Sequence, residues 1–90
     1  MQERKPASSQ DSEVIALKAL VFLATDAERL DRFLGLTGLT YDVIRRQAAD
    51  PAFLAGVLDH LLSDQTLLFL FAESEGLAPA QVERARGRLP

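Results

Sequence analysis

Two apolar segments of this chain are each followed by the pair Gly-Leu, at Gly38-Leu39 and, 38 residues later, at Gly76-Leu77. Glycine can adopt the left-handed backbone conformation that ends a helix, because it has no side chain to clash. An apolar residue directly after it can pack against the last helical turn. We therefore predict that a helix ends at each glycine with positive φ, and that Leu39 packs against Leu34 in a Schellman motif.

Helix start signals stand before the apolar segments. Thr25 and Glu28 have the spacing of a capping box. In this motif the Thr25 side chain accepts a bond from the backbone amide three residues later, and the Glu28 side chain accepts one from the amide of the cap residue. Further residues that favour helix starts are Thr40, Asp50 with Pro51, Ser63 with Asp64, and Pro79. These signals predict helices over about 12–24, 26–36, 41–49, 51–63 and 64–75, with a sixth beginning at residue 79.

The predicted helices fit one small domain. The chain has 90 residues, of which 48% are hydrophobic and 26% charged, as in ordinary globular proteins. No stretch alternates polar and apolar residues as a strand would. We expect an all-α fold, a compact bundle of five to six short helices, over residues 12–90. Residues 1–11 contain a proline and no helical periodicity, so we expect a disordered N-terminal tail there.

A second pattern relates the two halves of the chain, because similar residues recur 38 positions apart. The matched pairs include Leu20 with Leu58, Leu23 with Leu61, Thr25 with Ser63, Asp26 with Asp64, Leu30 with Leu68, and Phe33 with Phe71. A period of this length is typical of helical repeats and predicts two tandem three-helix units. The alternative is that any two helical segments share leucines and capping residues.

In this alignment each half has apolar residues where the other half is polar. The positions, with their counterparts in parentheses, are Val21 (Asp59), Phe22 (His60), Phe69 (Asp31) and Leu70 (Arg32). We expect the two apolar pairs to bury each other at an interface between the halves. The alternative is that one pair stays exposed as an interaction surface for a partner protein or a second copy of the chain.

The only histidine, His60, lies one helical turn before Asp64. Two ligands do not make a metal site, because structural and catalytic metals require three or four. A helical wheel places His60 at the rim of the apolar face of its helix, where we expect an exposed side chain with a local hydrogen bond. We expect neither a metal nor a cofactor.

Catalytic motifs are missing from the sequence. The five glycines are scattered singly, so no phosphate-binding loop is present, and no serine lies in a nucleophile elbow. Asp26, Asp50 and Asp64 are explained as residues of helix starts. We therefore do not expect an enzyme.

The charge of the chain bears on nucleic acid and membranes. The net charge is −3, whereas nucleic-acid-binding domains are usually basic. An arginine patch remains an alternative, formed by Arg45, Arg46, Arg84, Arg86 and Arg88. The apolar run 14–24 is interrupted by Lys18 and is shorter than the roughly 20 residues that a membrane-spanning helix needs. We expect no membrane association and a cytoplasmic protein.

Two segments of the chain, ALVFLATDAERLDRFLGLTGL and DPAFLAGVLDHLLSDQTLLFLFAESEGL, resemble a family of small uncharacterised alphaproteobacterial proteins, the domain of unknown function, family 3572. The resemblance covers about residues 15–86 and implies a bacterial cytoplasmic protein. It carries over no catalytic or binding residue. We expect a protein–protein interaction module with a regulatory role, present as a monomer or weak homodimer. A nucleic-acid-binding helical domain is the alternative.

Overall fold

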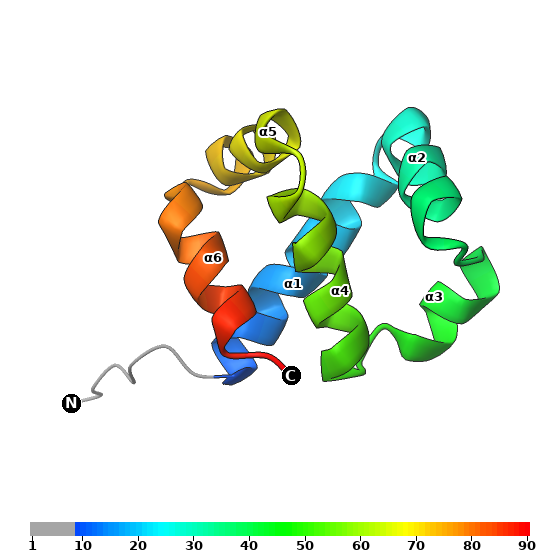
Figure 1. The fold of residues 1–90 in the computed structure, drawn as a ribbon, viewed down its shortest axis with the longest axis horizontal. Coiled ribbons are helices and arrows are strands. Elements are labelled where there is room, and N and C mark those ends of the chain that lie inside the picture. The colour runs from blue at the N-terminus through cyan, green and yellow to red at the C-terminus, as the bar shows by residue number, and fades with distance from the viewer. Residues whose placement is uncertain (1–8) are drawn as a thin grey trace.

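The computed structural model describes residues 9–90, and this part of the chain is all-helical, with no strand. Its six helices are α1 (Ser9–Ala24), α2 (Ala27–Thr37), α3 (Tyr41–Gln47), α4 (Pro51–Leu62), α5 (Gln65–Glu75) and α6 (Pro79–Gly87) (Figure 1). The all-α prediction is confirmed. Helix α1 begins three residues before the expected position, and the remainder of the predicted tail lies outside the described residues.

Helices α1 and α4 pack against each other at the centre of the domain (Figure 1). Helices α2 and α3 lie on one side of this pair, and α5 and α6 lie on the other. The two sides differ in how tightly they pack. Helix α6 packs against both α1 and α4, whereas α3 contributes no buried residue. The third helices of the two proposed units therefore have different roles in the fold.

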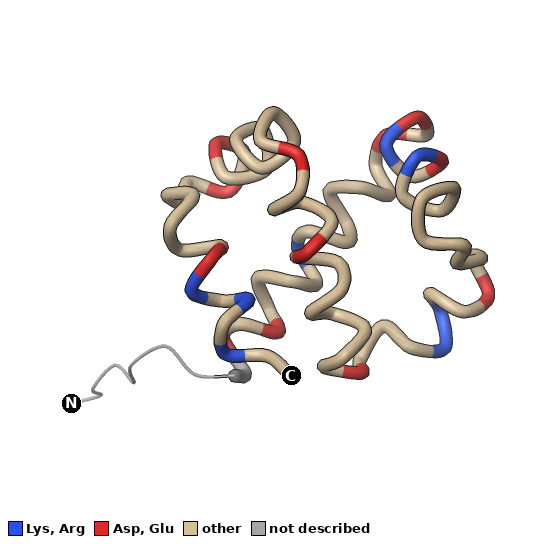
Figure 2. The backbone as a smooth tube through the Cα atoms, in the orientation of Figure 1, with Lys and Arg blue, Asp and Glu red and all other residues tan. Residues whose placement is uncertain are grey.

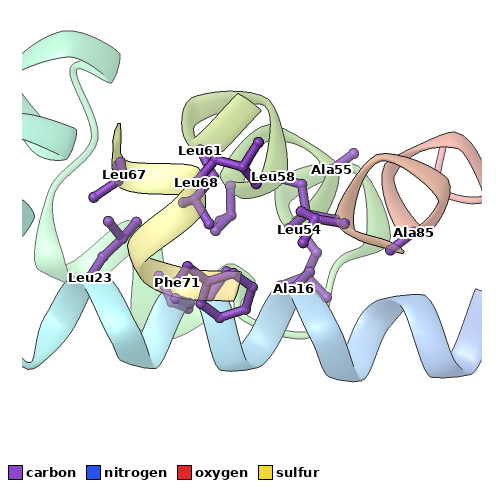
Figure 3. Close-up of a cluster of buried hydrophobic side chains, with 14 of the residues drawn as sticks. Ala16, Leu23, Leu54, Ala55, Leu58, Leu61, Leu67, Leu68, Phe71 and Ala85 are labelled. Atoms are coloured by element: carbon purple, nitrogen blue, oxygen red, sulfur yellow. The ribbon is translucent and has the colours of Figure 1, made fainter. Parts of the chain in front are cut away.

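One core cluster joins the helices. Helices α1, α4, α5 and α6 supply most of it, and Phe33 is the buried residue of α2. Ala16 and Leu23 point from α1 toward labelled side chains of α4 and α5 (Figure 3). The described residues of the cluster are Ala16, Ala19, Leu20, Leu23, Phe33, Leu54, Ala55, Val57, Leu58, Leu61, Leu67, Leu68, Phe71, Val82, Ala85 and Leu89.

Most predicted helix starts are present. The side chains of Thr40, Asp50 and Asp64 each accept a backbone N–H bond in the first turn of the helix that follows, and Pro79 is the first residue of α6. These interactions satisfy amides that have no partner within the helix. Before α6, the N–H of Ala78 donates to the side-chain oxygen of Gln81 at 2.8 Å.

The predicted capping box at Thr25 is wrong. Asp26 is the N-cap of α2, since its Oδ1 accepts bonds from the N–H groups of Glu28 and Arg29 at 3.0 and 3.1 Å. The Thr25 hydroxyl instead donates to the carbonyl of Phe22 at 2.8 Å, in the last turn of α1. Because α1 continues to Ala24, the extended backbone that an N-cap requires first appears at Asp26.

Both glycines have the predicted positive φ, 75° at Gly38 and 68° at Gly76. At the end of α5 the N–H of Leu77 bonds the carbonyl of Ala72 at 2.9 Å, and the N–H of Gly76 bonds that of Glu73 at 3.3 Å. This pair of bonds is a Schellman motif.

The Schellman motif predicted after α2 is wrong. The N–H of Gly38 bonds the carbonyl of Leu34 at 2.8 Å, which is the simpler left-handed ending. The N–H of Leu39 donates to the Thr37 hydroxyl at 3.3 Å and not to a carbonyl of the last turn. The threonine side chain therefore takes up the amide that would complete a Schellman motif.

No single helix among residues 9–90 is long and apolar enough to cross a bilayer. Helices α4 and α5 reach the necessary length and apolarity only together, and they are bent by 111° with respect to each other.

Candidate functional site

The two apolar pairs do not bury each other. Val21 is 61% exposed, Phe69 is 48% exposed and Leu70 is 43% exposed. Phe22 contacts α5 through a different residue, since its ring packs against Phe71 with centroids 5.5 Å apart. The predicted interface is therefore wrong, and Phe69 and Leu70 form an exposed apolar surface.

Helix geometry explains why Phe69 and Leu70 are exposed. Helix α5 buries Leu67, Leu68, Phe71 and Ala72 against the rest of the domain. Successive residues turn by about 100°, so Phe69 and Leu70 project away from this buried side. The helix has more apolar residues than one side can hold. We call Phe69, Leu70 and the adjoining Glu73 the α5 face.

A second exposed apolar surface lies on α1. Val14, Leu17 and Val21 are all exposed, and their spacing of three and four residues places them on one side of the helix. Ala16, Ala19 and Leu23 lie on the opposite, buried side. We call the three exposed residues the α1 face. The sequence analysis did not single out Val14 and Leu17 as surface residues. Their helical spacing, on the side opposite the small residues Ala16 and Ala19, could have indicated this face.

A groove of about 470 Å³ runs beside the α1 face. Its lining includes Phe22 of α1 and Ser74 and Glu75 at the end of α5. Lys18 and Glu75 form an ion pair across it at 3.8 Å, with the lysine side chain more than half exposed. An exposed ion pair of this kind contributes little to stability. Arg29 of α2 lies over the Phe22 ring, with its guanidinium carbon 4.4 Å from the ring centroid.

His60 lies in a second groove of about 450 Å³ between α2 and the start of α5. The prediction that His60 is exposed is wrong, because only 9% of the residue is accessible and its ring packs edge to face on Phe33 at 4.9 Å. Its Nε2 is buried without a hydrogen-bond partner. Burial lowers the pKa of His60 below 6.5 and nearby Arg32 lowers it further, while Asp64 raises it. The imidazole is therefore neutral near pH 7.

The arginines of the proposed basic patch are largely paired. Arg45 and Arg46 both lie near Asp42, at 3.2 and 3.7 Å. Arg86 bonds Asp59 at 2.6 Å and also donates to the carbonyls of Leu89 and Pro90. Their positive charge is thus partly neutralised within the domain.

Metal-binding side chains are not grouped in residues 9–90. No set of three or more histidine, aspartate and glutamate side chains lies together there. Asp64, which the sequence places one helical turn after His60, uses Oδ1 to accept the Leu67 N–H bond at 3.2 Å.

These features define a small all-helical domain with two exposed apolar helix faces. The chain belongs to the family described as "Protein of unknown function (DUF3572)", whose model matches residues 9–90. No curated protein and no solved structure matches the chain significantly.

Proposed function

We propose that this protein is a protein-binding module that acts through the α5 face, with the α1 face as a second candidate surface. The observation that carries the proposal is the exposure of Phe69 and Leu70 side by side on α5. Single exposed apolar residues are common, but adjacent large ones leave a contiguous area that association can remove from water. Aromatic residues also dominate the energetics of many protein interfaces.

The α1 face supports the same class of function. Exposed residues at the spacing of Val14, Leu17 and Val21 suit contact with a helix of another protein, which is a recurrent mode of recognition. A cytoplasmic setting fits a chain without cysteine.

The alternative of nucleic-acid binding has less support. Phosphate recognition needs cations that are free to contact the backbone, and Arg45, Arg46 and Arg86 already lie beside carboxylates. Catalysis also has little support. Asp26, Asp50 and Asp64 accept backbone bonds at helix starts, so these three carboxylates have a capping role that requires no acid–base function.

Affinity capture from the native cells tests the proposal. Tagged protein and a Phe69→Ser/Leu70→Ser variant are compared, with Leu36→Ser as the control, because Leu36 is exposed on α2. Proteins retained by the wild type and the control but lost with the double variant are then purified, and their binding is measured directly. A Leu17→Ser/Val21→Ser variant tests the α1 face in the same way. If all the variants retain the same purified partners as the wild type, the proposal is wrong.

A further inference from the structure

The second half of the chain has an uneven charge distribution. No lysine or arginine occurs between Arg46 and Arg84, a stretch that contains all of α4 and α5. Its acidic residues are Asp50, Asp59, Asp64, Glu73, Glu75 and Glu83. Figure 2 shows red segments and no blue along α4 and α5. Helix α5 therefore carries no positive charge of its own. On its Leu70 side it borders a groove in which Arg29 and Arg32 of α2 are accompanied by the carboxylates Glu28 and Asp64.

Most of these carboxylates have partners within the domain. Asp59 pairs with Arg86, Glu75 pairs with Lys18, and Asp50 and Asp64 accept backbone bonds. Glu73 is exposed and forms no ion pair with the residues that the structure describes.

Glu73 belongs to the same surface as the exposed apolar pair. It follows Leu70 by three residues and Phe69 by four, and residues at these spacings are neighbours on a helix. The α5 face thus combines two large apolar side chains with one free carboxylate.

We infer that the α5 face binds a basic amphipathic helix of a partner protein. This inference rests on the proposed function and adds the chemistry of the partner. The apolar side of such a helix would cover Phe69 and Leu70, and a lysine or arginine beside it would reach Glu73. Complementary charge of this kind increases the association rate and excludes partners of the wrong charge.

The same charges disfavour other occupants. A symmetric contact between two copies through this face would bring the acidic side of one α5 against that of the other. Nucleic acid presents phosphates, which a carboxylate repels. A basic partner is the occupant that the apolar pair and Glu73 both accommodate.

The probe is a synthetic amphipathic helix with leucine on one side and lysine on the other, labelled with fluorescein. A matched peptide has glutamate in place of each lysine. Binding is measured by fluorescence anisotropy at low salt and at about 0.15 M salt, where exposed charges are partly screened. We expect saturable binding of the lysine peptide, weaker at the higher salt, and no saturable binding of the glutamate peptide.

Matched variants locate the binding site. Phe69→Ser or Leu70→Ser should weaken binding of the lysine peptide roughly tenfold or more, because each removes an apolar contact at the centre of the face. Glu73→Lys should weaken binding and reduce its salt dependence. Glu83→Lys makes the same charge change on α6, and Leu36→Ser removes an exposed apolar residue of α2. Both should leave the affinity unchanged, and circular dichroism checks that every variant folds.

Several results would overturn the inference. Equal binding of the glutamate peptide would exclude charge recognition. Equal weakening by Glu83→Lys and Glu73→Lys would indicate a general effect of net charge. A dimer in sedimentation that Phe69→Ser dissociates would assign the face to a second copy. If the lysine peptide fails to bind while capture of a native partner still depends on Phe69 and Leu70, the inference is wrong and the proposed function stands. If neither binding event depends on these residues, both are wrong.

Discussion

The rings of Phe22 and Phe71 pack edge to face, with centroids 5.5 Å apart and planes inclined at 62°. Helix α1 supplies the first ring and α5 the second, so this contact fixes which side of α5 turns toward α1. Phe69 lies two residues before Phe71 and therefore projects toward solvent. Two phenylalanines of the same apolar run thus have opposite environments.

Replacing these two phenylalanines should separate the core from the surface. Phe71→Ala should lower the free energy of unfolding by about 3 to 5 kcal/mol, because it leaves a cavity in a fully buried site. Phe69→Ala should lower it by about 1 kcal/mol or less, since the side chain is half exposed. Denaturation by urea, followed by circular dichroism, measures both values. Similar losses for the two variants would mean that Phe69 is part of the core.

Alanine at the two helix-ending glycines should be destabilising. Gly38→Ala and Gly76→Ala should each cost about 1 kcal/mol, because a residue with a side chain is strained at positive φ. An added Cβ would meet no atom at either position, so the cost comes from the backbone alone.

Gly35 provides the matched control within α2. It lies inside the helix with open space around an added Cβ, and Gly35→Ala should stabilise the protein by up to about 1 kcal/mol. Thermal and urea denaturation give the two signs. A stabilising effect at Gly38 would show that its φ is not constrained by the helix ending.

The choice of N-cap for α2 can be tested with two adjacent residues. Asp26→Ala should lower the free energy of unfolding by about 1 kcal/mol, because its carboxylate accepts two amide bonds. Thr25→Ala should have a smaller effect, since its hydroxyl bonds a carbonyl that already belongs to the last turn of α1. Urea denaturation of the two variants measures the difference. The reverse order would restore the capping box that the sequence suggests.

The stability of the protein should depend on the protonation of His60. Its pKa is lower in the folded protein than the ordinary 6.5, so the unfolded chain binds the proton more readily. The stabilising contribution is fully present above about pH 6.5 and is lost as the pH falls through the folded pKa.

Urea denaturation between pH 5 and 8 measures this effect, and NMR titration of the imidazole gives its pKa directly. His60 is the only histidine, so a single imidazole titrates in this range. In a His60→Gln variant the decrease of stability toward pH 5 should be smaller. An NMR pKa at or above 6.5 would contradict the buried, neutral imidazole.

The sequence predicted the features that depend on interactions between neighbouring residues. The caps at Thr40, Asp50 and Asp64 and the left-handed glycines involve atoms only a few positions apart, so their pattern is visible in the residue order. Where two neighbours could both cap a helix, the pattern was insufficient. Asp26 and not Thr25 caps α2, because α1 continues to Ala24 and the backbone is extended at Asp26.

The exposure of particular side chains was decided by tertiary structure. His60 is buried because Phe33 of α2 packs on its ring, a contact between residues far apart in the sequence. Helix α5 is apolar on every side from Leu67 to Ala72, so its residue order contains no preference for the side that turns inward. Packing against α4, α6 and the ring of Phe22 buries one side and leaves Phe69 and Leu70 in solvent, because a helix at the edge of a bundle can face the core on one side only.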